Sequence, residues 1–386
     1  MSRDRSDRDR IYLDNAATTQ MSEGVKKAME PYLEKNFGNA STVYSYGEEA
    51  KKGLVHARQS IARSLGAKPS EIYFTSGGSE SDNWAIKCVA GEYKQKGKHI
   101  ITSRIEHHAV LNSCQYLEEL GYEVTYIGVD EKGMVSPEEV RKAIRPDTSL
   151  ISIMFGNNEV GTIQPIMQIG EIAREQGVLF HTDAVQAYAQ IPIDVRKYPI
   201  DLLSASAHKF HGPKGVGFLF IKDGVSLPSF IHGGSQESGK RAGTENVAGI
   251  VGMGRASELA FLDMRTRIQR ETMLRNYLLE KVIHEIPEVR INGHRSKRLP
   301  GNASFSFRGV DGASLVILLD EDGICASGGS ACNTGEERVS YVIRELGVPE
   351  EYAPGTIRMS LCGTTKREDI DRAVESLKKN VKLLRE

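Results

Sequence analysis

Apolar residues follow two different spacings along most of this chain. Nearly continuous apolar runs of a few residues, which are typical of buried strands, alternate with longer segments in which apolar side chains recur every three or four positions, as in helices. The predicted strands are 11–13, 71–75, 99–103, 123–127, 149–155, 177–181, 200–203 and 218–221. The predicted helices are 25–35, 47–65, a segment that follows Ser79, 109–120, 137–144 and 166–176.

This alternation predicts an α/β fold. Strands that are apolar along their whole length are buried on both faces, so we expect a mostly parallel sheet with helices on both sides. In such sheets ligands bind outside the carboxyl ends of the strands. Polar residues that directly follow the strands are therefore the first candidates for a functional site.

The last third of the chain predicts a second, smaller unit. A chain of 386 residues is longer than one hydrophobic core usually supports. A long charged helix is predicted at 254–286, followed by strands at 289–291 and 303–307 and helices at 313–319 and 339–346. Ile370, Val374, Leu377, Val381 and Leu384 form one apolar stripe of a C-terminal helix. This mixture predicts an α+β domain.

Composition excludes several classes of protein. A formal net charge of −1 gives no electrostatic reason to expect nucleic acid or an anionic membrane as a direct partner. No apolar run approaches the roughly 20 residues that span a bilayer. The mixed-charge segment 1–10 lacks the apolar core of a secretory signal and predicts a disordered tail. Five cysteines without a CxxC pair argue against a disulfide framework or metal site and favour a reducing cytoplasm.

A lysine shortly after the predicted strand 200–203 is the basis of the first chemical hypothesis. Lys209 lies between small hydroxyl residues and the Gly/Pro-rich turn 212–217. An amine at a strand end can form a Schiff base with a carbonyl compound. Ser206 and His208 are small donors that suit a phosphate beside that amine. The alternative is an ordinary solvated lysine in a loop.

A second candidate is the glycine-rich turn after the strand 71–75. Ser76 to Asn83 runs from that strand into a helix, and the first N–H groups of a helix, with the positive end of its dipole, bind anions. The alternative is a helix start that is only capped.

Further polar residues follow three other strands, where parallel strands would bring them together. They are the groups 106–108, 157–159 and 183–186, which include His107, Asn158, Asp183 and Gln186. Each has an ordinary alternative, such as a surface histidine or a helix-capping aspartate. Together they supply an aromatic cover, an acid and amide donors, as a pyridine-ring cofactor requires.

Three motifs resemble the class V pyridoxal-phosphate enzymes, and among them the cysteine desulfurases. They are Tyr-Leu-Asp-Asn-Ala-Ala-Thr-Thr at 12–19, Ser-x-His-Lys at 206–209 and Gly-Pro-Lys-Gly-x-Gly at 212–217. The resemblance implies an aspartate-aminotransferase-like fold (fold type I) and pyridoxal 5'-phosphate on Lys209. It also implies that Asp183 keeps the ring nitrogen protonated and that His107 stacks on the ring and moves protons. Asn158 and Gln186 would contact the phenolic oxygen, and Gly78, Ser79, Ser206 and His208 the phosphate.

The resemblance extends to the second unit. The segment 327–332, Ser-Gly-Gly-Ser-Ala-Cys, resembles the desulfurase group with a long mobile catalytic loop, although a glycine replaces the second serine of its motif. Cys332 lies among small polar residues, where an exposed thiol is expected, and the thiolate is the nucleophile. Cys88, Cys114, Cys325 and Cys362 are interpreted as inert thiols.

Substrate and partner residues follow from the same resemblance. Arg358 would bind the substrate carboxylate with its planar fork, and Asn39 would assist it, although Ala40 replaces the usual proline. Thr244, in the loop 232–244, would reach the cofactor phosphate of a neighbouring subunit, which implies a homodimer with shared sites. The domains implied are 15–255 and, for the smaller one, 11–14 with 256–386.

The activity implied is conversion of L-cysteine to L-alanine, with sulfur left on Cys332 as a persulfide. The sulfur acceptor would be an iron–sulfur scaffold or a tRNA-thiolation protein. A selenocysteine lyase or a cystine lyase would share the same cofactor residues. A non-catalytic scaffold is the alternative from another class, and a purified protein that binds no cofactor would favour it.

Overall fold

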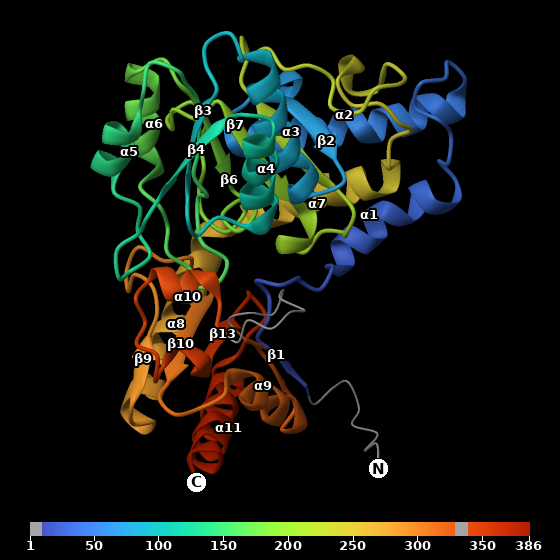
Figure 1. Cartoon of the computed structure of the whole chain (residues 1–386). Helices are drawn as coiled ribbons and strands as arrows, with labels where there is room; N and C mark the ends of the chain where they lie inside the picture. Colours follow the sequence, from blue (N-terminus) through green and yellow to red (C-terminus); the bar gives the residue numbers. More distant parts are fainter. Residues whose placement is uncertain (1–9, 329–338) are drawn as a thin grey trace.

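The computed structural model describes residues 10–328 and 339–386. Residues 1–9, with most of the predicted tail, and residues 329–338, with Cys332, lie outside the described residues. The described chain forms two parts, which lie one above the other in Figure 1. The larger part contains a seven-stranded sheet and the smaller a four-stranded sheet.

The seven-stranded sheet is mixed but mostly parallel, as predicted. Its strands, in spatial order, are β2 (Ile72–Thr75), β8 (Gly217–Ile221), β7 (Leu202–Ser206), β6 (Leu179–Asp183), β5 (Thr148–Ser152), β3 (His99–Ser103) and β4 (Glu123–Ile127). Only β8 runs against its neighbours in this sheet. Residues 207–216 connect β7 to β8, and this connection is shorter than the dozen or so residues that a parallel crossover needs, so the two strands are antiparallel.

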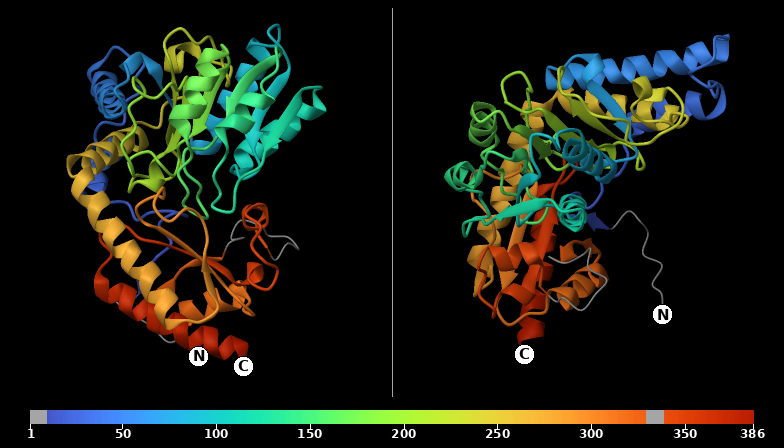
Figure 2. Two further views of the ribbon diagram at one scale, coloured as in Figure 1. Left: turned by 90° about the vertical axis from the view of Figure 1, so that its left-hand side faces the viewer. Right: turned by 45° about the horizontal axis from the view of Figure 1, so that its top comes forward.

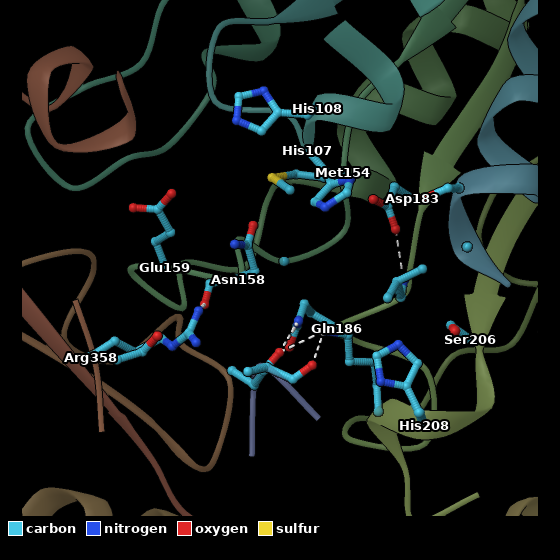
Figure 3. A pocket seen from close by; sticks show the side chains of 18 of the residues that line it. His107, His108, Met154, Asn158, Glu159, Asp183, Gln186, Ser206, His208 and Arg358 are labelled. Carbon is cyan, nitrogen blue, oxygen red and sulfur yellow. Dashed lines mark hydrogen bonds between the residues drawn. The ribbon is translucent and has the colours of Figure 1, made fainter. Parts of the chain in front are cut away.

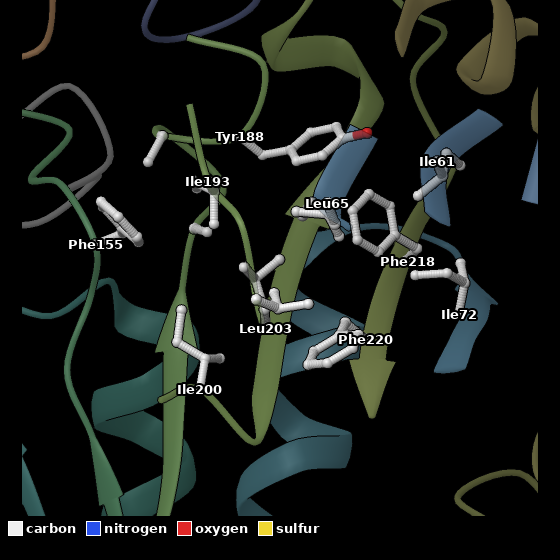
Figure 4. Packing of buried hydrophobic residues seen from close by; sticks show 14 of the residues in the cluster. Ile61, Leu65, Ile72, Phe155, Tyr188, Ile193, Ile200, Leu203, Phe218 and Phe220 are labelled. Atoms are coloured by element: carbon white, nitrogen blue, oxygen red, sulfur yellow. The ribbon is translucent and has the colours of Figure 1, made fainter. Parts of the chain in front are cut away.

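Helices cover both faces of this sheet, and each face has its own hydrophobic core. The helices of this part are α1 (Glu23–Glu34), α2 (Ser45–Leu65), α3 (Gly78–Glu92), α4 (His108–Glu119), α5 (Pro137–Ala143), α6 (Ile166–Glu175) and α7 (Val247–Leu262). Leu203 and Leu202 are adjacent on β7 but point to opposite faces, the first toward α2 and α7 and the second toward α3 and α4. Figure 4 shows the first core, where Leu203 and Phe220 pack near Ile72. Burying one such side chain stabilises the fold by about 1.5–3 kcal/mol.

The smaller part packs helices against an antiparallel sheet. Its strands, in spatial order, are β12 (Ser327–Gly328), β13 (Thr356–Ser360), β10 (Asn302–Phe307) and β9 (Val289–Ile291). Its helices are α8 (Met264–Glu285), α9 (Gly312–Glu321), α10 (Tyr341–Glu345) and α11 (Arg367–Arg385). A hydrophobic core separate from those of the larger part joins α8, α9, α11 and β10. Figure 2 shows α8 and α11 on the outer side of this sheet.

The N-terminal strand belongs to the smaller part. β1 (Ile11–Tyr12) pairs in parallel with β11 (Ile324–Cys325), and Ile11 and Leu13 enter the core of the smaller part. The chain then crosses to the larger part through residues 14–19. This crossing brings the turn beside strand ends of both sheets.

The single long helix predicted at 254–286 is wrong. The structure has two helices, α7 and α8, which meet at Asp263, whose backbone (φ −129°, ψ 22°) is not helical. Ile250 and Met253 of α7 enter a core of the larger part, whereas Leu278 of α8 enters the core of the smaller part. The break separates these two packing environments, and the charged periodicity continues across it. No helix in the described parts of the chain is long and apolar enough to cross a membrane.

Candidate active site

A cavity of about 470 Å³ lies between the carboxyl ends of the larger sheet's strands and β12–β13 of the smaller sheet. Its volume lies within the range of small-molecule sites. Figure 3 shows the side chains that converge on it. The predicted residues that line it are Gly78, Ser79, His107, Asn158, Asp183, Gln186, Ser206, His208, Lys209 and Arg358. The structure thus brings together residues from both sheets.

Lys209 reaches the cavity from the end of β7. The strand ends at Ser206, and the short 3-10 turn Ala207–Lys209 directs the lysine side chain toward the N-terminal turn. Its Nζ donates hydrogen bonds of 2.8 Å to the carbonyl oxygens of Ala16 and Ala17. The amine is therefore held at a defined position on the cavity wall.

Asp183 and His107 face the same region of the cavity. Asp183 ends β6, is only 5% exposed, and accepts a 2.9 Å bond from the amide of Val185. Burial raises the pKa of its carboxyl, and the nearby His107 and Lys209 oppose that shift. A buried acid of this kind is stabilised as the carboxylate by a cation placed against it.

His107 is the N-cap of α4, and this fixes its ring. Its Nδ1 accepts a 3.1 Å hydrogen bond from the amide of Ala109, so a neutral ring carries its proton on Nε2. Burial lowers the pKa of His107, which favours that neutral form near pH 7. The ring can therefore donate a proton from Nε2 toward the cavity.

The start of α3 forms a glycine-lined concavity. Gly77 has φ 154°, which side chains rarely adopt, and a Cβ there would lie 3.6 Å from the Ser206 hydroxyl. A Cβ on Gly78 would lie 2.5 Å from a methyl carbon of Val185, closer than side-chain atoms approach. Glycine at both positions leaves the helix N-terminus open to an anion.

His208 borders the same concavity as a neutral donor. Burial and the charge of Lys209 lower the pKa of its ring to about 4. Its Nδ1 lies 3.2 Å from the Thr18 hydroxyl. The ring is uncharged near neutral pH, so it can assist a phosphate through a hydrogen bond and not through charge.

Arg358 brings a cation from β13 of the smaller sheet to the cavity. Its Nη1 donates a 2.9 Å bond to the carbonyl of Asn158, and its Nη2 donates a 2.7 Å bond to the carboxylate of Asp14. Its Nε is buried and has no hydrogen-bond partner among the residues that the structure describes. A guanidinium with an unused buried donor suits a further carboxylate ligand.

Three predicted residues are not placed in the cavity. Asn39 lies on the exposed segment between α1 and α2, where its side chain accepts a bond from the amide of Ser41. Thr244 lines a separate cavity of about 180 Å³ with Ser76, Glu237 and Arg241. Cys332 lies outside the described residues.

Other residues that line the cavity or contact Lys209 were not among the predicted site residues. They are Asp14, Ala16, Ala17, Asp82, His108, Met154, Gly156, Glu159, Val185, Ser327, Gly328, Ser340 and Tyr341. The motif at 12–19 pointed to the N-terminal turn but not to individual contacts. Asp82 carries a signal that could have been used, because it lies one helical turn after Gly78 and therefore on the same face of α3.

Pyridoxal phosphate, which the resemblance implies, fits these residues. The glycine concavity at α3 suits its phosphate, and the buried Asp183 carboxyl suits a protonated ring nitrogen. The Lys209 amine can bind its aldehyde. The ring plane requires a flat neighbour, which the His107 imidazole offers.

Comparison with known proteins gives one consistent family. The aminotransferase class-V family matches residues 11–373. A cysteine desulfurase IscS of Methanosarcina thermophila is 52% identical over 97% of this chain and 93% of that protein. A cysteine desulfurase IscS of Dictyoglomus turgidum is 51% identical over 97% of this chain and 95% of that protein.

Solved structures agree with the sequence comparisons. A NifS-like protein superposes with a TM-score of 0.91 at 38% identity, covering 97% of this chain and all of that one. SspA, solved in complex with cysteine, superposes with a TM-score of 0.82 at 38% identity, covering 92% of this chain and all of that one. The predicted fold type is thereby confirmed.

Proposed function

The chain belongs to the aminotransferase class-V family, and from that membership we propose that it is a pyridoxal-phosphate-dependent cysteine desulfurase. It would convert L-cysteine to L-alanine and transfer the sulfur to one of its own cysteines. One observation carries the proposal: a single cavity joins the Lys209 amine, the buried Asp183 carboxyl and the Arg358 guanidinium. Together with relatives at about 50% identity over nearly the whole chain, this arrangement supports desulfuration.

The cofactor and the protein divide the chemistry. Bound pyridoxal phosphate supplies an aldehyde that links to amines and a protonated ring that stabilises negative charge at the substrate's α-carbon. Lys209 would hold the cofactor and, once freed, remove the α-proton as a general base. Asp183 would keep the ring nitrogen protonated, because a carboxylate in a buried site is stabilised by that cation.

Substrate orientation would come from Arg358 and His107. The guanidinium would hold the carboxylate of L-cysteine through a charge-assisted pair of hydrogen bonds. His107 would donate or accept a proton at Nε2, since its Nδ1 is engaged by the amide of Ala109. These two contacts orient the substrate's α-carbon toward Lys209.

Cys332 is the proposed sulfur acceptor within the enzyme. Its thiolate would attack the sulfur of the bound substrate, so that the carbon–sulfur bond breaks and a persulfide forms on Cys332. Ser327 and Gly328, just before the undescribed segment, and Ser340, just after it, line the cavity. These flanking positions support a role for the segment at this site.

A homodimer is proposed from Thr244 and an exposed apolar surface. Phe37, Val43 and Tyr44, between α1 and α2, and Tyr46, at the start of α2, are each more than half exposed, Val43 being 92% exposed. Such a cluster is typical of an interaction surface. The loop that carries Thr244 lies at the same end of the molecule in Figures 1 and 2. A second copy bound there would bring Thr244 toward the partner's phosphate site.

The final acceptor of the sulfur is proposed by class only. An iron–sulfur scaffold or a tRNA-thiolation protein in a reducing cytoplasm would take the persulfide sulfur. Transfer by thiol exchange needs an accessible thiolate on the acceptor. The two candidate acceptors can be distinguished by experiment, because only transfer to the scaffold ends in an iron–sulfur cluster.

Mass spectrometry tests the proposed function directly. The protein loaded with pyridoxal phosphate is incubated with L-cysteine, digested without reductant and searched for a peptide that gains sulfur. We expect the gain on the peptide of Cys332, with L-alanine formed, and Cys325→Ala serves as the matched control that retains both. A gain on Cys325, or no L-alanine, would contradict the proposal.

A further inference from the structure

The N-terminal turn, residues 14–17, contacts two functional side chains at once. The carbonyl oxygens of Ala16 and Ala17 each accept a 2.8 Å hydrogen bond from Lys209 Nζ. The carboxylate of Asp14 accepts one of 2.7 Å from Arg358. The turn therefore lies between the amine of the larger part and the guanidinium of the smaller part.

Ser360 holds the peptide that immediately precedes the two carbonyls that contact Lys209. Its hydroxyl accepts a 2.8 Å bond from the amide of Ala16, and its carbonyl accepts a 2.8 Å bond from Asn15 Nδ2. Ser360 is 4% exposed and lies on β13, on the same face as Arg358 by strand alternation. One strand thus carries both Arg358 and the hydroxyl that holds the turn.

Tyr12 supports the turn from its other side. Its hydroxyl donates to the carbonyl of Thr18 at 2.9 Å and lies 3.1 Å from that of Asp14. Gln186 Nε2 adds a 2.9 Å bond to the carbonyl of Ala16. The Ala16 carbonyl therefore accepts from both Gln186 and Lys209, which requires a fixed orientation of this peptide.

We propose that Ser360 is a positioning residue for Lys209, acting through the Ala16–Ala17 carbonyls, which hold the lysine amine whenever it is not bonded to the cofactor. This inference rests on the proposed function, in which freed Lys209 is the base. A lysine side chain has many rotamers, so an unheld amine would spend little time in reach of the α-proton. Proton transfer requires hydrogen-bond reach between the base and the proton it takes.

The expected kinetic effect is selective. Ser360→Ala leaves the Ala16 amide without its hydroxyl partner and loosens the carbonyls. We expect kcat to fall about 10- to 100-fold, as misplacement of a reacting group by about 1 Å can cause. KM for L-cysteine should change less than about twofold, because the side chain of Arg358 is unaltered.

A second measurement uses the protein without cofactor or substrate. The apo protein is treated with a limiting amine-acylating reagent, and the rate of modification of Lys209 is followed by peptide mass spectrometry. Loss of one hydrogen bond, worth about 1 kcal/mol, corresponds to a roughly fivefold faster modification in Ser360→Ala. Other lysines of the same sample provide the internal reference.

Three further variants make the test specific. Tyr12→Phe, at a position that is 41% exposed, should lower kcat and speed Lys209 modification, as Ser360→Ala does. Ser360→Thr keeps the hydroxyl and should show the wild-type kcat and the wild-type modification rate. Ser306→Ala is the matched control, since Ser306 is a fully buried serine of the same sheet bonded to Thr356 at 2.7 Å, and it should change neither.

Two outcomes would overturn the inference. One is a Ser360→Ala protein whose kcat and Lys209 modification equal those of the wild type. The other is a Ser306→Ala protein in which kcat and Lys209 modification change as much as in Ser360→Ala. That result would show that disturbance of the sheet, and not loss of the Ser360 hydroxyl, causes the change. If the wild type formed no L-alanine from L-cysteine, the proposed function would fail, but the modification rates would still decide whether Ser360 holds Lys209.

Discussion

The guanidinium of Arg358 donates a 2.7 Å hydrogen bond to the carboxylate of Asp14, although the two residues lie 344 positions apart in the sequence. The bond joins β13 of the smaller sheet to the N-terminal turn. Asp14 uses one terminal nitrogen of the fork, and within residues 10–328 and 339–386 the buried Nε donor has no partner. The arginine is therefore oriented before substrate arrives, and part of its donor set remains for a carboxylate.

Replacing Arg358 by lysine should weaken binding of L-cysteine. Lysine keeps the charge but cannot form a planar pair of hydrogen bonds while also reaching Asp14. We expect KM to rise about 10-fold or more, with a smaller change in kcat. Steady-state alanine formation measures both. Arg290→Lys, on β9 of the same sheet and outside the cavity lining, should leave KM unchanged, and an equal rise in that variant would contradict the assignment.

Replacing Lys209 by alanine should abolish covalent attachment of pyridoxal phosphate. Without the amine no carbon–nitrogen bond to the cofactor can form and be reduced by borohydride. Peptide mass spectrometry after reduction should find the adduct on Lys209 in the wild type and on no lysine in the variant. Lys214→Ala, at an exposed position nearby, should keep the adduct. A reduced adduct on another lysine in the Lys209 variant would refute the assignment.

The buried carboxyl of Glu106 should make the free energy of unfolding smaller at alkaline pH than at acidic pH. Its side chain is fully buried, and burial raises the pKa of its carboxyl to about 8. In the unfolded chain the carboxyl has an ordinary pKa near 4.3. The folded protein therefore binds a proton that the unfolded chain releases, so the stabilisation is complete below about pH 4 and is lost as the pH rises through 8.

Glu106→Gln removes this dependence and keeps an oxygen for the bonds from Ser103 and the amide of Met154. At pH 9 we expect the variant to gain at least about 1 kcal/mol in its free energy of unfolding relative to the wild type. At pH 5 the gain should be much smaller, because most of the stabilisation is lost between pH 5 and 8. Urea unfolding at both values measures the difference, with Glu119→Gln, on the exposed side of α4, as control. If the variant gained as much unfolding free energy at pH 5 as at pH 9, the gain would come from altered packing and not from ionisation of Glu106.

Charge placed on the exposed apolar surface should disrupt the proposed homodimer. Val43→Asp and Phe37→Asp each put a carboxylate where a partner would bury apolar area. Light scattering coupled to size exclusion should show a shift from dimer to monomer, and the monomer should lose pyridoxal phosphate faster because Thr244 could not reach a partner. Ile317→Asp, on the exposed side of α9, should remain dimeric. A monomeric wild type would refute the dimer.

Much of the fold followed from the sequence because its signals are local. The strands His99–Ser103 and Glu123–Ile127 were predicted with their observed bounds, since each is a short segment rich in β-branched residues between turns. Placement of Asp183, His107 and Lys209 beside one cavity followed from the rule that parallel strands end at one edge. The domain boundary at 255/256 stays a prediction, although Ala256 still packs in a core of the larger part and residues of α8 enter the core of the smaller part.

Contacts between distant segments could not be predicted. The bonds from Lys209 to Ala16 and Ala17 depend on β1 pairing with β11, and no periodicity within residues 11–19 indicates that partner. The break at Asp263 was missed because one charged helical pattern continues through it. The roles proposed for Asn39, Thr244 and Cys332 depend on a second subunit or on residues outside those described, so they stay predictions.

The parallel pairing of β1 with β11 has a consequence for synthesis on the ribosome. Ile11 leaves the exit tunnel early, but its partner strand at Ile324 is translated roughly 300 residues later. At about 5–20 residues per second, the first strand waits on the order of 15–60 s for its neighbour. The turn beside Lys209 can therefore be completed only near the end of translation, so nascent chains that stall earlier would be unable to assemble this catalytic centre.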